Sequence, residues 1–467
     1  MRSIPGPRRI PFLGSTGTLL RFFRDPIKCM LNLHDAYGEI AAVSGGDSSL
    51  VCAFGPDCNQ QVLSDPSTYH NAAEFPIRIP RGSAIHRLTT FLVGMNGVEH
   101  QRLRRALAPL FQKSYLHHHR DSMVMATEAA LAHWRPGTEI DLSEAAAELA
   151  LGVSFRCLFG LDVTAESRPL AEMALGFTTG VTSPAKLLVP WDVPGLPYSR
   201  FMRQCERHEA RLRELIDVRR KNSDEKNDTL SVLLTLRDED GKPLSDSLLV
   251  GLANEMFIAG HDTTARTVAW TLFLLERHPA IRTKVLEELH AELRGEPPTV
   301  DDIVRLPMLD AVIKESQRIL PATPWLFFRR PNAPVQLGPY ELPAGSGIIL
   351  SPLLTHRKPE TFPEPRRFKP SRWNNFTPGP YAYLPFGAGP RMCLGVSFAT
   401  LSLRVILAMI LQRFRLTSPD DAEVSYQARG VILGTKNGVR MRIDRQDGAS
   451  PTPRPVRGNI PDLVELD

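Results

Sequence analysis

A single long helical pattern constrains this chain more than any other feature. It runs from about Asp246 to His278 and stops at Pro279, because proline cannot continue a helix. At 1.5 Å per residue, this helix would be about 50 Å long, well beyond the roughly 30 Å width of a small domain. Such an element indicates a large and mostly helical protein.

Shorter patterns agree with that interpretation. The stretch AAAELALGVSF combines strong helix formers with an apolar stripe, whereas VQLGPYELPAGSGIIL has the short apolar pieces and turn residues of a β-hairpin. We therefore predict a mainly α fold with a minor β region near the N-terminus and again after residue 322. The other predicted helices cover residues 99–111, 140–160, 206–221, 280–293, 308–320 and 395–413.

No obvious linker divides the sequence. We expect a single domain over residues 1–445, followed by a disordered polar tail over residues 446–467. Prolines and glycines over residues 178–201 predict a loop between two helices, and loops of that length inside a compact domain are usually functional.

Composition excludes several classes of protein. With 467 residues, 42% of them hydrophobic and 23% charged, the chain is not intrinsically disordered. A net charge of +5 is too diffuse to indicate nucleic-acid binding, and no base-reading motif occurs. No run of 18 apolar residues predicts a transmembrane anchor. An Arg-rich transit peptide is an alternative for the N-terminus, but a proline-rich arm is the simpler reading.

The six cysteines are scattered and form no CxxC pair, which favours a reducing compartment, so we expect a cytoplasmic protein. Taken alone, each cysteine is expected to be a small buried hydrophobe. One of them lies in the segment PFGAGPRMCLG, residues 385–395. Five spaced positions of this segment form a pattern that rarely arises by chance: Phe386, Gly389, Arg391, Cys393 and Gly395.

This segment resembles the haem-binding loop of the cytochrome P450 superfamily, the haem-thiolate monooxygenases. The resemblance implies that Cys393 is the axial ligand of haem b, iron protoporphyrin IX, and that the fold is the single large helical fold of that superfamily. A predicted helix follows Cys393 closely, and its N-terminal end favours a thiolate. A buried cysteine in a glycine-rich turn is the other reading.

The neighbouring residues suit the same cofactor. Gly389 and Gly395 let the backbone approach a flat macrocycle, since they carry no side chain. Arg391 can pair with a haem propionate, and Phe386 can pack beside the sulfur. A thiolate ligand favours cleavage of the O–O bond.

A second motif, FIAGHDTTAR, lies at the centre of the long helix. Gly260 and the β-branched Thr263 break local helix preference there, and such breaks tend to mark functional sites. In the resembled family, Ala259 and Gly260 leave room for dioxygen, and Asp262 with Thr263 delivers protons. Without that context, Asp262 would be interpreted as a capped or solvated acid.

A third motif is KESQR, in which Glu315 and Arg318 share a helix face. The ExxR spacing also occurs at residues 99–102 and 364–367, so the spacing alone is weak. The later hexapeptide FKPSRW resembles a family element whose Arg372 completes a structural network with Glu315 and Arg318.

Further cations are candidates for contact with the haem propionates. His100 and Arg104 lie at i and i+4 on one helix face, although a solvated basic face is the alternative. Arg329 is another candidate, and sequence alone leaves Arg330 open. Consecutive histidines at residues 117–119 point in different directions on a helix, which favours a solvated surface over a metal site.

The resemblance implies insertion of one atom of dioxygen into a hydrophobic small molecule, by hydroxylation or epoxidation. Fatty acids, terpenoids or steroids, and polyketide or peptide products all stay open, and the 178–201 loop tilts the prediction towards a secondary metabolite or lipid. The expected substrate contacts are mostly apolar: Phe75, Phe91, Phe257, Ala322, Thr323, Trp325 and Leu326.

Electrons are expected from a separate ferredoxin or flavodoxin with its NAD(P)H reductase, since too few residues follow Cys393 for another redox module. Basic residues outnumber acids over residues 357–372 and could steer an acidic donor, or merely aid solubility. Two alternative functions are an enzyme that uses peroxide or isomerises its substrate and a non-catalytic haem-binding or ligand-binding module.

Overall fold

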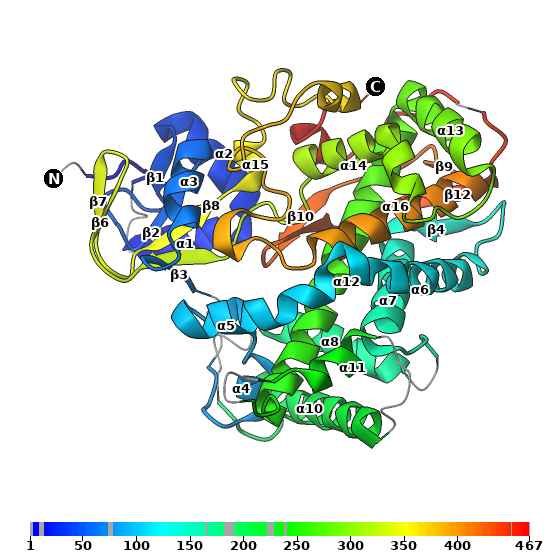
Figure 1. Cartoon of the computed structure of the whole chain (residues 1–467). Coiled ribbons are helices and arrows are strands. Elements are labelled where there is room, and N and C mark those ends of the chain that lie inside the picture. The colour runs from blue at the N-terminus through cyan, green and yellow to red at the C-terminus, as the bar shows by residue number, and fades with distance from the viewer. Residues whose placement is uncertain are drawn as a thin grey trace.

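Helices dominate the computed structural model of the chain, which describes residues 3–8, 14–72, 78–164, 167–181, 191–221, 228–237, 241–449 and 451–466 (Figure 1). The strands form small sheets, so the predicted mainly α fold with a minor β region is confirmed. The helices are α1 (Gly14–Arg24), α2 (Pro26–Tyr37), α3 (Pro56–Ser64), α4 (Ala84–Leu88), α5 (Gly97–Leu107), α6 (Lys113–Leu131), α7 (Leu142–Phe159), α8 (Arg168–Val181), α10 (Pro197–Lys221), α11 (Thr229–Thr235), α12 (Asp246–Arg277), α13 (Pro279–Leu293), α14 (Pro307–Ile319), α15 (Pro352–Thr355) and α16 (Val396–Arg413).

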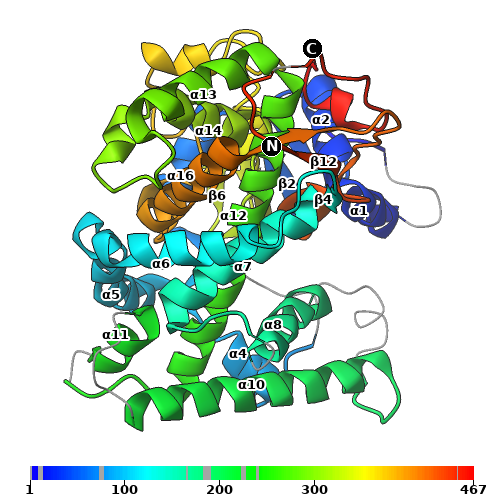
Figure 2. The ribbon, with the colours of Figure 1, turned by 90° about the vertical axis from the view of Figure 1, so that its right-hand side faces the viewer.

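The long predicted helix is α12, and it passes through the middle of the molecule (Figure 2). Ser245 caps its first turn by accepting the Leu248 N–H, and Pro279 follows its last turn. Helices α4, α8 and α10 pack on its first half, whereas α13, α14 and α16 pack nearer its end. Most of its second half is buried, which explains why its apolar residues show no clean amphipathic stripe.

The two predicted β regions meet in one five-stranded sheet, ordered β1-β2-β8-β5-β3. Strand β2 runs parallel to β8, with Leu50 opposite Gly347, and β5 runs antiparallel to β3 and β8. The predicted hairpin is β6 paired with β7. The strands are β1 (Ile40–Ala42), β2 (Leu50–Ala53), β3 (Tyr69–Ala72), β4 (Glu139–Asp141), β5 (Phe328–Pro331), β6 (Val335–Leu337), β7 (Tyr340–Leu342), β8 (Gly347–Leu350), β9 (Phe414–Thr417), β10 (Tyr426–Arg429), β11 (Ile432–Thr435) and β12 (Arg440–Arg445).

The region around the predicted 178–201 loop is more helical than expected. Helix α8 continues to Val181, and α10 begins at Pro197, nine residues before the predicted start at Glu206. Pro197 fits the first turn of a helix, where its missing N–H would have no partner in any case. Residues 182–190 of the predicted loop lie outside the described residues.

The prediction of a disordered tail is wrong for the part that the structure describes. Ile460, Leu463 and Val464 are fully buried in the main apolar cluster, which also contains Phe22 near the other end of the chain. The backbone N–H of Val424 donates to Arg457 O at 2.8 Å, which anchors the tail further. Only a few apolar side chains anchor the tail, so its mostly polar composition predicted disorder. The single-domain organisation stays a prediction.

Helix α16 is long and apolar enough to cross a membrane by length and composition, and more than half of it is buried inside the protein. Its apolar residues pack on α6, α12, α13 and α14. Burial of this kind is typical of a core helix in a globular protein.

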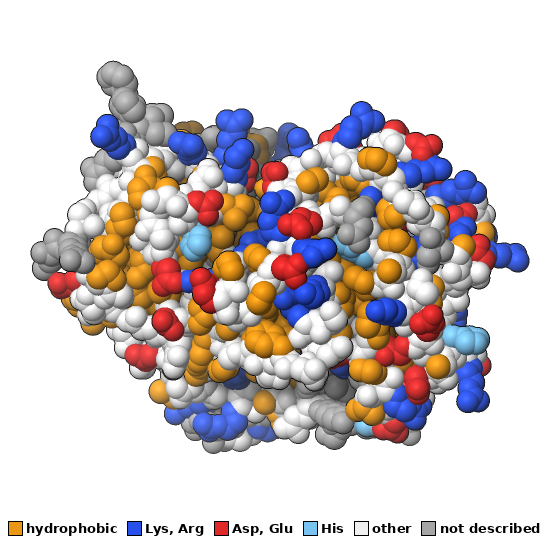
Figure 3. Space-filling view, turned by 90° about the horizontal axis from the view of Figure 1, so that it is seen from above, with side chains coloured by type: hydrophobic (Ala, Val, Ile, Leu, Met, Phe, Trp, Pro, Cys, Tyr) orange, Lys and Arg blue, Asp and Glu red, His pale blue; other side chains and the backbone are white. Residues whose placement is uncertain are grey.

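On the face shown in Figure 3, basic and acidic side chains are intermingled.

Candidate active site

A tight loop presents Cys393 ahead of α16. The Cys393 N–H donates to Phe386 O at 2.9 Å, and Gly387 supplies a left-handed turn, with φ at +72°, that lets the loop close. Helix α16 follows after its N-cap residue Gly395. The Cys393 side chain is exposed to an open space, although dense protein surrounds the loop. A sulfur that is accessible and close to a helix N-terminus suits an axial ligand.

Opposing influences act on the Cys393 thiol. Burial raises the pKa of Cys393, whereas the backbone N–H of Gly395 and the guanidinium of Arg104 lower it. Arg104 lies nearby because its Nη2 donates to Met392 O at 2.7 Å. A positive charge and an N–H donor beside the sulfur would both stabilise a thiolate.

Four cationic or potentially cationic side chains act on one another beside this loop, and we call them the cation cluster: His100, Arg104, Arg329 and Arg391. Burial, followed by Arg391 and Arg104, lowers the pKa of His100 to about 4. Burial and Arg391 lower the pKa of Arg329 to about 10. Burial disfavours the charged form of each group, and positive neighbours add to this for His100, Arg329 and Arg391, so a bound anion would stabilise the cluster.

Arg391 provides the clearest fit test for a haem. Its Nη2 donates to Asn96 Oδ1 at 2.7 Å, but its buried Nε and Nη1 make no hydrogen bond within the described part of the chain. Burial and Arg104 lower the pKa of Arg391 to about 10. Because buried guanidinium nitrogens normally have partners, these atoms fit the carboxylate of a haem propionate.

The structure distinguishes Arg329 from Arg330. Successive residues of a strand point to opposite faces, and in β5 Arg329 is buried beside Asn71 and within reach of Arg391. Arg330 instead donates to Gly345 O at 2.9 Å. The structure therefore places Arg329, and not Arg330, in the cation cluster.

The central motif of α12 faces open space on one side. Ala259 is exposed within a largely buried helix, and Asp262 and Thr263 are half-buried. The Thr263 hydroxyl donates to Ala259 O at 3.0 Å, and Asp262 pairs with Arg266 at 3.0 Å. The predicted room for a ligand at Ala259 stays a prediction, with which the small side chain at this exposed position is compatible.

Two glycines of the predicted site have a different structural reason. A Cβ on Gly260 would lie 3.3 Å from both Leu158 and Ser154 of α7, so its missing side chain permits close packing of α7 on α12. A Cβ on Gly389 would overlap the Leu63 carbonyl of α3. Only Gly395 has space around it, with the Cys393 sulfur 4.0 Å from the added Cβ.

The predicted Glu315, Arg318 and Arg372 network is present. Arg318 makes two hydrogen bonds of 2.9 Å to Glu315, and Arg372 Nε lies 3.0 Å from the same carboxylate. Trp373 Nε1 donates to Glu315 at 3.0 Å, and Arg318 Nη1 and Nη2 also donate to backbone carbonyls. Glu315 and Arg318 are 0% exposed, so every charge in this network is buried and partnered.

The predicted substrate contacts differ in burial. Phe257 lies in an aromatic cluster, 4.2 Å from Phe159 between ring centroids, so it belongs to the core. Phe91 and Trp325 are buried, whereas three other predicted contacts, Ala322, Thr323 and Leu326, are half-buried. Phe75 lies outside the described residues.

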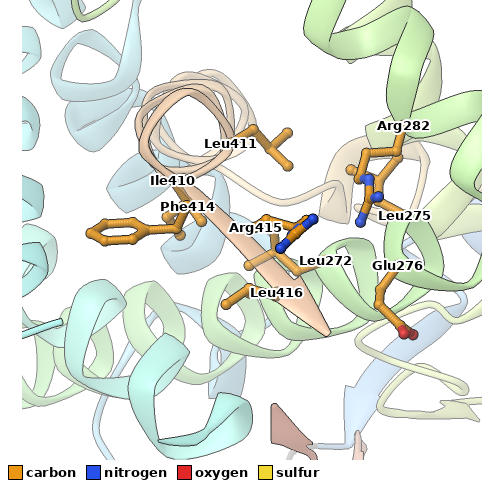
Figure 4. A pocket seen from close by; sticks show the side chains of 9 residues that line it. All are labelled: Leu272, Leu275, Glu276, Arg282, Ile410, Leu411, Phe414, Arg415 and Leu416. Carbon is orange, nitrogen blue, oxygen red and sulfur yellow. The ribbon is translucent and has the colours of Figure 1, made fainter. Parts of the chain in front are cut away.

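One cavity lies far from this site, beside the end of α12 (Figure 4). Leu272, Glu276, Arg282 and Arg415 are among the residues that line it. Its volume of about 10 Å³ admits at most one water molecule. It is therefore a packing gap and not a substrate site.

Sequence reasoning missed three polar residues beside the site. Asn71 Nδ2 donates to Val93 O at 2.7 Å, and Asn96 links the Asn71 backbone to Arg391. Glu255 of α12 accepts the backbone N–H groups of Leu92 and Val93. The position of Asn96 just before a helix was the only sequence signal, because the other contacts join distant parts of the chain.

Comparison with known proteins finds relatives that match almost the whole chain. Residues 4–439 match the family model described as Cytochrome P450. The chain is 30% identical to pentalenene oxygenase of Streptomyces avermitilis over 94% of its own length and 96% of that protein. It is 31% identical to cyclooctat-9-en-7-ol 5-monooxygenase of Streptomyces melanosporofaciens, over 88% of each.

Solved structures show the same fold. The retinoic acid-bound cyanobacterial CYP120A1 superposes with a TM-score of 0.83 at 22% identity, covering 95% of this chain and 99% of that one. The haem domain of cytochrome P450DA also gives 0.83, covering 96% and 98%. The chain belongs to the cytochrome P450 family. It is a monooxygenase of that family, whose cofactor is a haem, and the predicted family and enzyme class are confirmed.

Proposed function

We propose that this chain uses haem b, held by Cys393, to insert one atom of dioxygen into a bulky hydrophobic molecule. The observation that carries the proposal is the exposed Cys393 sulfur beside a cation cluster whose Arg391 has two nitrogens with no partner among the described residues. A bound haem would supply dioxygen binding and activation. The protein supplies the iron ligand and charges that neutralise the propionates.

The residues around the haem have separate tasks in this proposal. His100, Arg104, Arg329 and Arg391 would hold the propionates, and Phe386 would pack beside the Cys393 sulfur. Ala259 would leave space for dioxygen. Asp262 and Thr263 move protons to the site, for which the Asp262 carboxylate must rotate away from Arg266, its present partner at 3.0 Å.

For the substrate, we propose a secondary metabolite or lipid. The two Streptomyces relatives are named for pentalenene and cyclooctat-9-en-7-ol. Ala322, Thr323 and Leu326 would offer a largely apolar surface to such a molecule.

The electron donor is proposed to be a cytoplasmic ferredoxin or flavodoxin. We propose the basic segment 357–372 as its docking surface, without Arg357 and Arg372, because both are engaged inside the protein. Lys358 pairs with Glu39. Three exposed cations remain, Arg366, Arg367 and Lys369, and Glu364 pairs with the last two.

Replacement of the sulfur ligand tests the proposed function. In Cys393→Ser, the reduced carbon monoxide complex should lose the red-shifted absorbance band of the wild-type protein. Persistence of that band in the variant would contradict the ligand assignment. Product formation with reductant and dioxygen, but not with peroxide alone, would distinguish the monooxygenase from a peroxide-using enzyme, and absence of any turnover would favour a binding module.

A further inference from the structure

The segment Leu88–Gly94 lies along α12, where three residues of one helical turn contact its backbone. Asn254 Nδ2 donates to Leu88 O at 2.9 Å, and the Glu255 carboxylate accepts the N–H groups of Leu92 and Val93 at 3.0 Å each. A Cβ on Gly251 would overlap the Thr90 carbonyl oxygen, so glycine permits the close approach. We call Gly251, Asn254 and Glu255 the α12 clasp.

Glu255 is the charged member of the clasp, and it faces the active site. Residues four apart share a helix face, so Glu255 lies one turn from Ala259 and two turns from Thr263. It is also close enough to Cys393 to raise the pKa of that thiol. Burial raises the pKa of Glu255 itself to about 7, against the lowering effect of the two backbone N–H groups. The side chain is half-buried, and the Leu92 and Val93 N–H groups fix the position of its carboxylate.

The same segment is held from the opposite side. Val93 O accepts the Asn71 side-chain N–H at 2.7 Å, and Asn96, two residues after Gly94, binds Arg391 of the cation cluster at 2.7 Å. The segment therefore spans the distance between the open face of α12 and the proposed propionate site. Leu88 is the last residue of α4, and beyond it the only regular structure of the segment is one short 3-10 turn over Leu92–Gly94, so side chains of neighbouring elements hold the rest in place.

From these contacts, we infer that Glu255 is a positioning residue that fixes Leu88–Gly94 as a wall of the substrate site and so decides which bulky ligands fit. The inference rests on the proposed function, because the wall borders the space assigned to haem and substrate. Glu255 acts through the backbone of Leu92 and Val93 and needs no contact with the reacting atoms. Loss of its carboxylate frees two enclosed N–H donors and releases the wall.

Glu276 provides a matched control in the same helix. Like the half-buried Glu255, it is a carboxylate that accepts a backbone N–H, from Ser418 at 3.2 Å, but it is buried and lies at the far end of α12 beside the small cavity of Figure 4. A loss of general stability should follow replacement of either residue. A change in ligand selection should follow only replacement of Glu255.

The test uses the haem-loaded wild-type protein and the variants Glu255→Ala, Glu255→Gln and Glu276→Gln. Imidazole and 4-phenylimidazole, a small and a bulky iron ligand, are titrated by the shift of the haem absorbance. In Glu255→Ala, we expect 4-phenylimidazole to bind about tenfold more weakly while imidazole changes by less than about twofold. Glu255→Gln keeps one acceptor oxygen and should fall between wild type and alanine. Glu276→Gln should keep the wild-type ratio.

Trypsin cleavage after Arg87 gives a second readout that needs no haem ligand. Arg87 directly precedes the segment Leu88–Gly94 and pairs with Glu209 at 2.5 Å. If the segment is released in Glu255→Ala, the chain around Arg87 should open more often, and cleavage should become at least severalfold faster. Unchanged ligand ratios together with unchanged cleavage, or equal changes in Glu276→Gln, would overturn the inference. If wild type bound neither azole, the proposed function would fail instead, and cleavage would still decide whether Glu255 holds the segment.

Discussion

Two arginine-rich regions of this protein differ in how far their positive charges are neutralised by other parts of the protein. Around Glu315, the charges of Arg318 and Arg372 are matched by one carboxylate and by backbone carbonyls, and the network has no open partner position on Arg318. In the cation cluster, the positive groups act on one another, and two nitrogens of Arg391 have no partner in the part of the chain that the structure describes.

The difference separates a structural network from a binding site. A set of buried charges that satisfies itself can hold a fold but has nothing left to offer a ligand. A set that repels itself is tolerable only if something else supplies the opposite charge. The comparison predicts opposite responses to mutation, and the following experiments test it in order of decreasing effect.

The largest effect is expected for Glu315→Gln. The variant leaves Arg318 and Arg372 buried without their shared carboxylate, so the free energy of unfolding should fall by about 3–5 kcal/mol. Denaturant unfolding of the haem-bound protein measures the change. A loss well under 1 kcal/mol would mean that the network is not structural and would remove the basis of the comparison.

A smaller effect should come from acid, acting through His356 beside Arg318. Leu384 N–H donates to His356 Nε2 at 2.7 Å, so the ring is neutral and its Nδ1–H donates to Arg318 O. Burial, followed by Arg318, lowers the pKa of His356 to about 3 from an ordinary value of 6.5. Its contribution is therefore complete above pH 6.5 and lost as the pH falls towards 3.

Between pH 6.5 and 5.0, that loss should amount to about 2 kcal/mol, measured by denaturant unfolding. The slope should flatten in His356→Gln, which has no titrating ring. Replacement of His133, an exposed histidine, should leave the slope of the wild type. Equal slopes in wild type and His356→Gln would assign the acid sensitivity to other groups.

Arg391→Gln should act in the opposite sense to Glu315→Gln. Haem should transfer to apomyoglobin about tenfold more readily, because a propionate partner is lost. The haem-free protein should be no less stable than wild type, since the repulsion with Arg104 is relieved. Arg330→Gln, on the other face of β5, serves as the control. A marked destabilisation of haem-free Arg391→Gln would show that the cluster is structural.

The smallest effect is expected for Glu364→Gln. Glu364 pairs with Arg367 and Lys369 at the surface, and its pKa is lowered to about 2 by Lys369 and then Arg367. Exposed pairs contribute little to stability, so the unfolding midpoint at neutral pH should not move measurably. A large shift would mean that exposure is a poor guide to the value of an ion pair in this protein.

The sequence predicted those parts of the site that depend on short motifs. Cys393 and Arg391 follow from the motif at 385–395, the Glu315 and Arg318 pair follows from its spacing together with the resemblance of FKPSRW, and α12 follows from a continuous helical pattern ended by proline. Arg329 could not be separated from Arg330 until the strand pairing showed which face each occupies.

What the sequence could not predict depends on packing between distant segments. Gly260 is required by close packing against α7 and Gly389 by close packing against α3. Because neither neighbour is visible in the sequence, the motif predicts a cofactor contact for both. Glu255 and Asn71 join the site through partners that only the folded chain brings near. The order of the tail around Ile460 could not be predicted, because burial of a few apolar side chains fixes a segment whose composition is mostly polar.

The five-stranded sheet also constrains the order in which the molecule can be assembled. Strands β1 and β2 are synthesised early, yet β2 obtains its second neighbour, β8, only when Gly347 and the residues after it have emerged. Until then, one edge of β2 exposes unpaired N–H and C=O groups. Contacts between such remote positions make folding slow. The nascent N-terminal half must therefore avoid pairing with other chains while most of the protein is still being made.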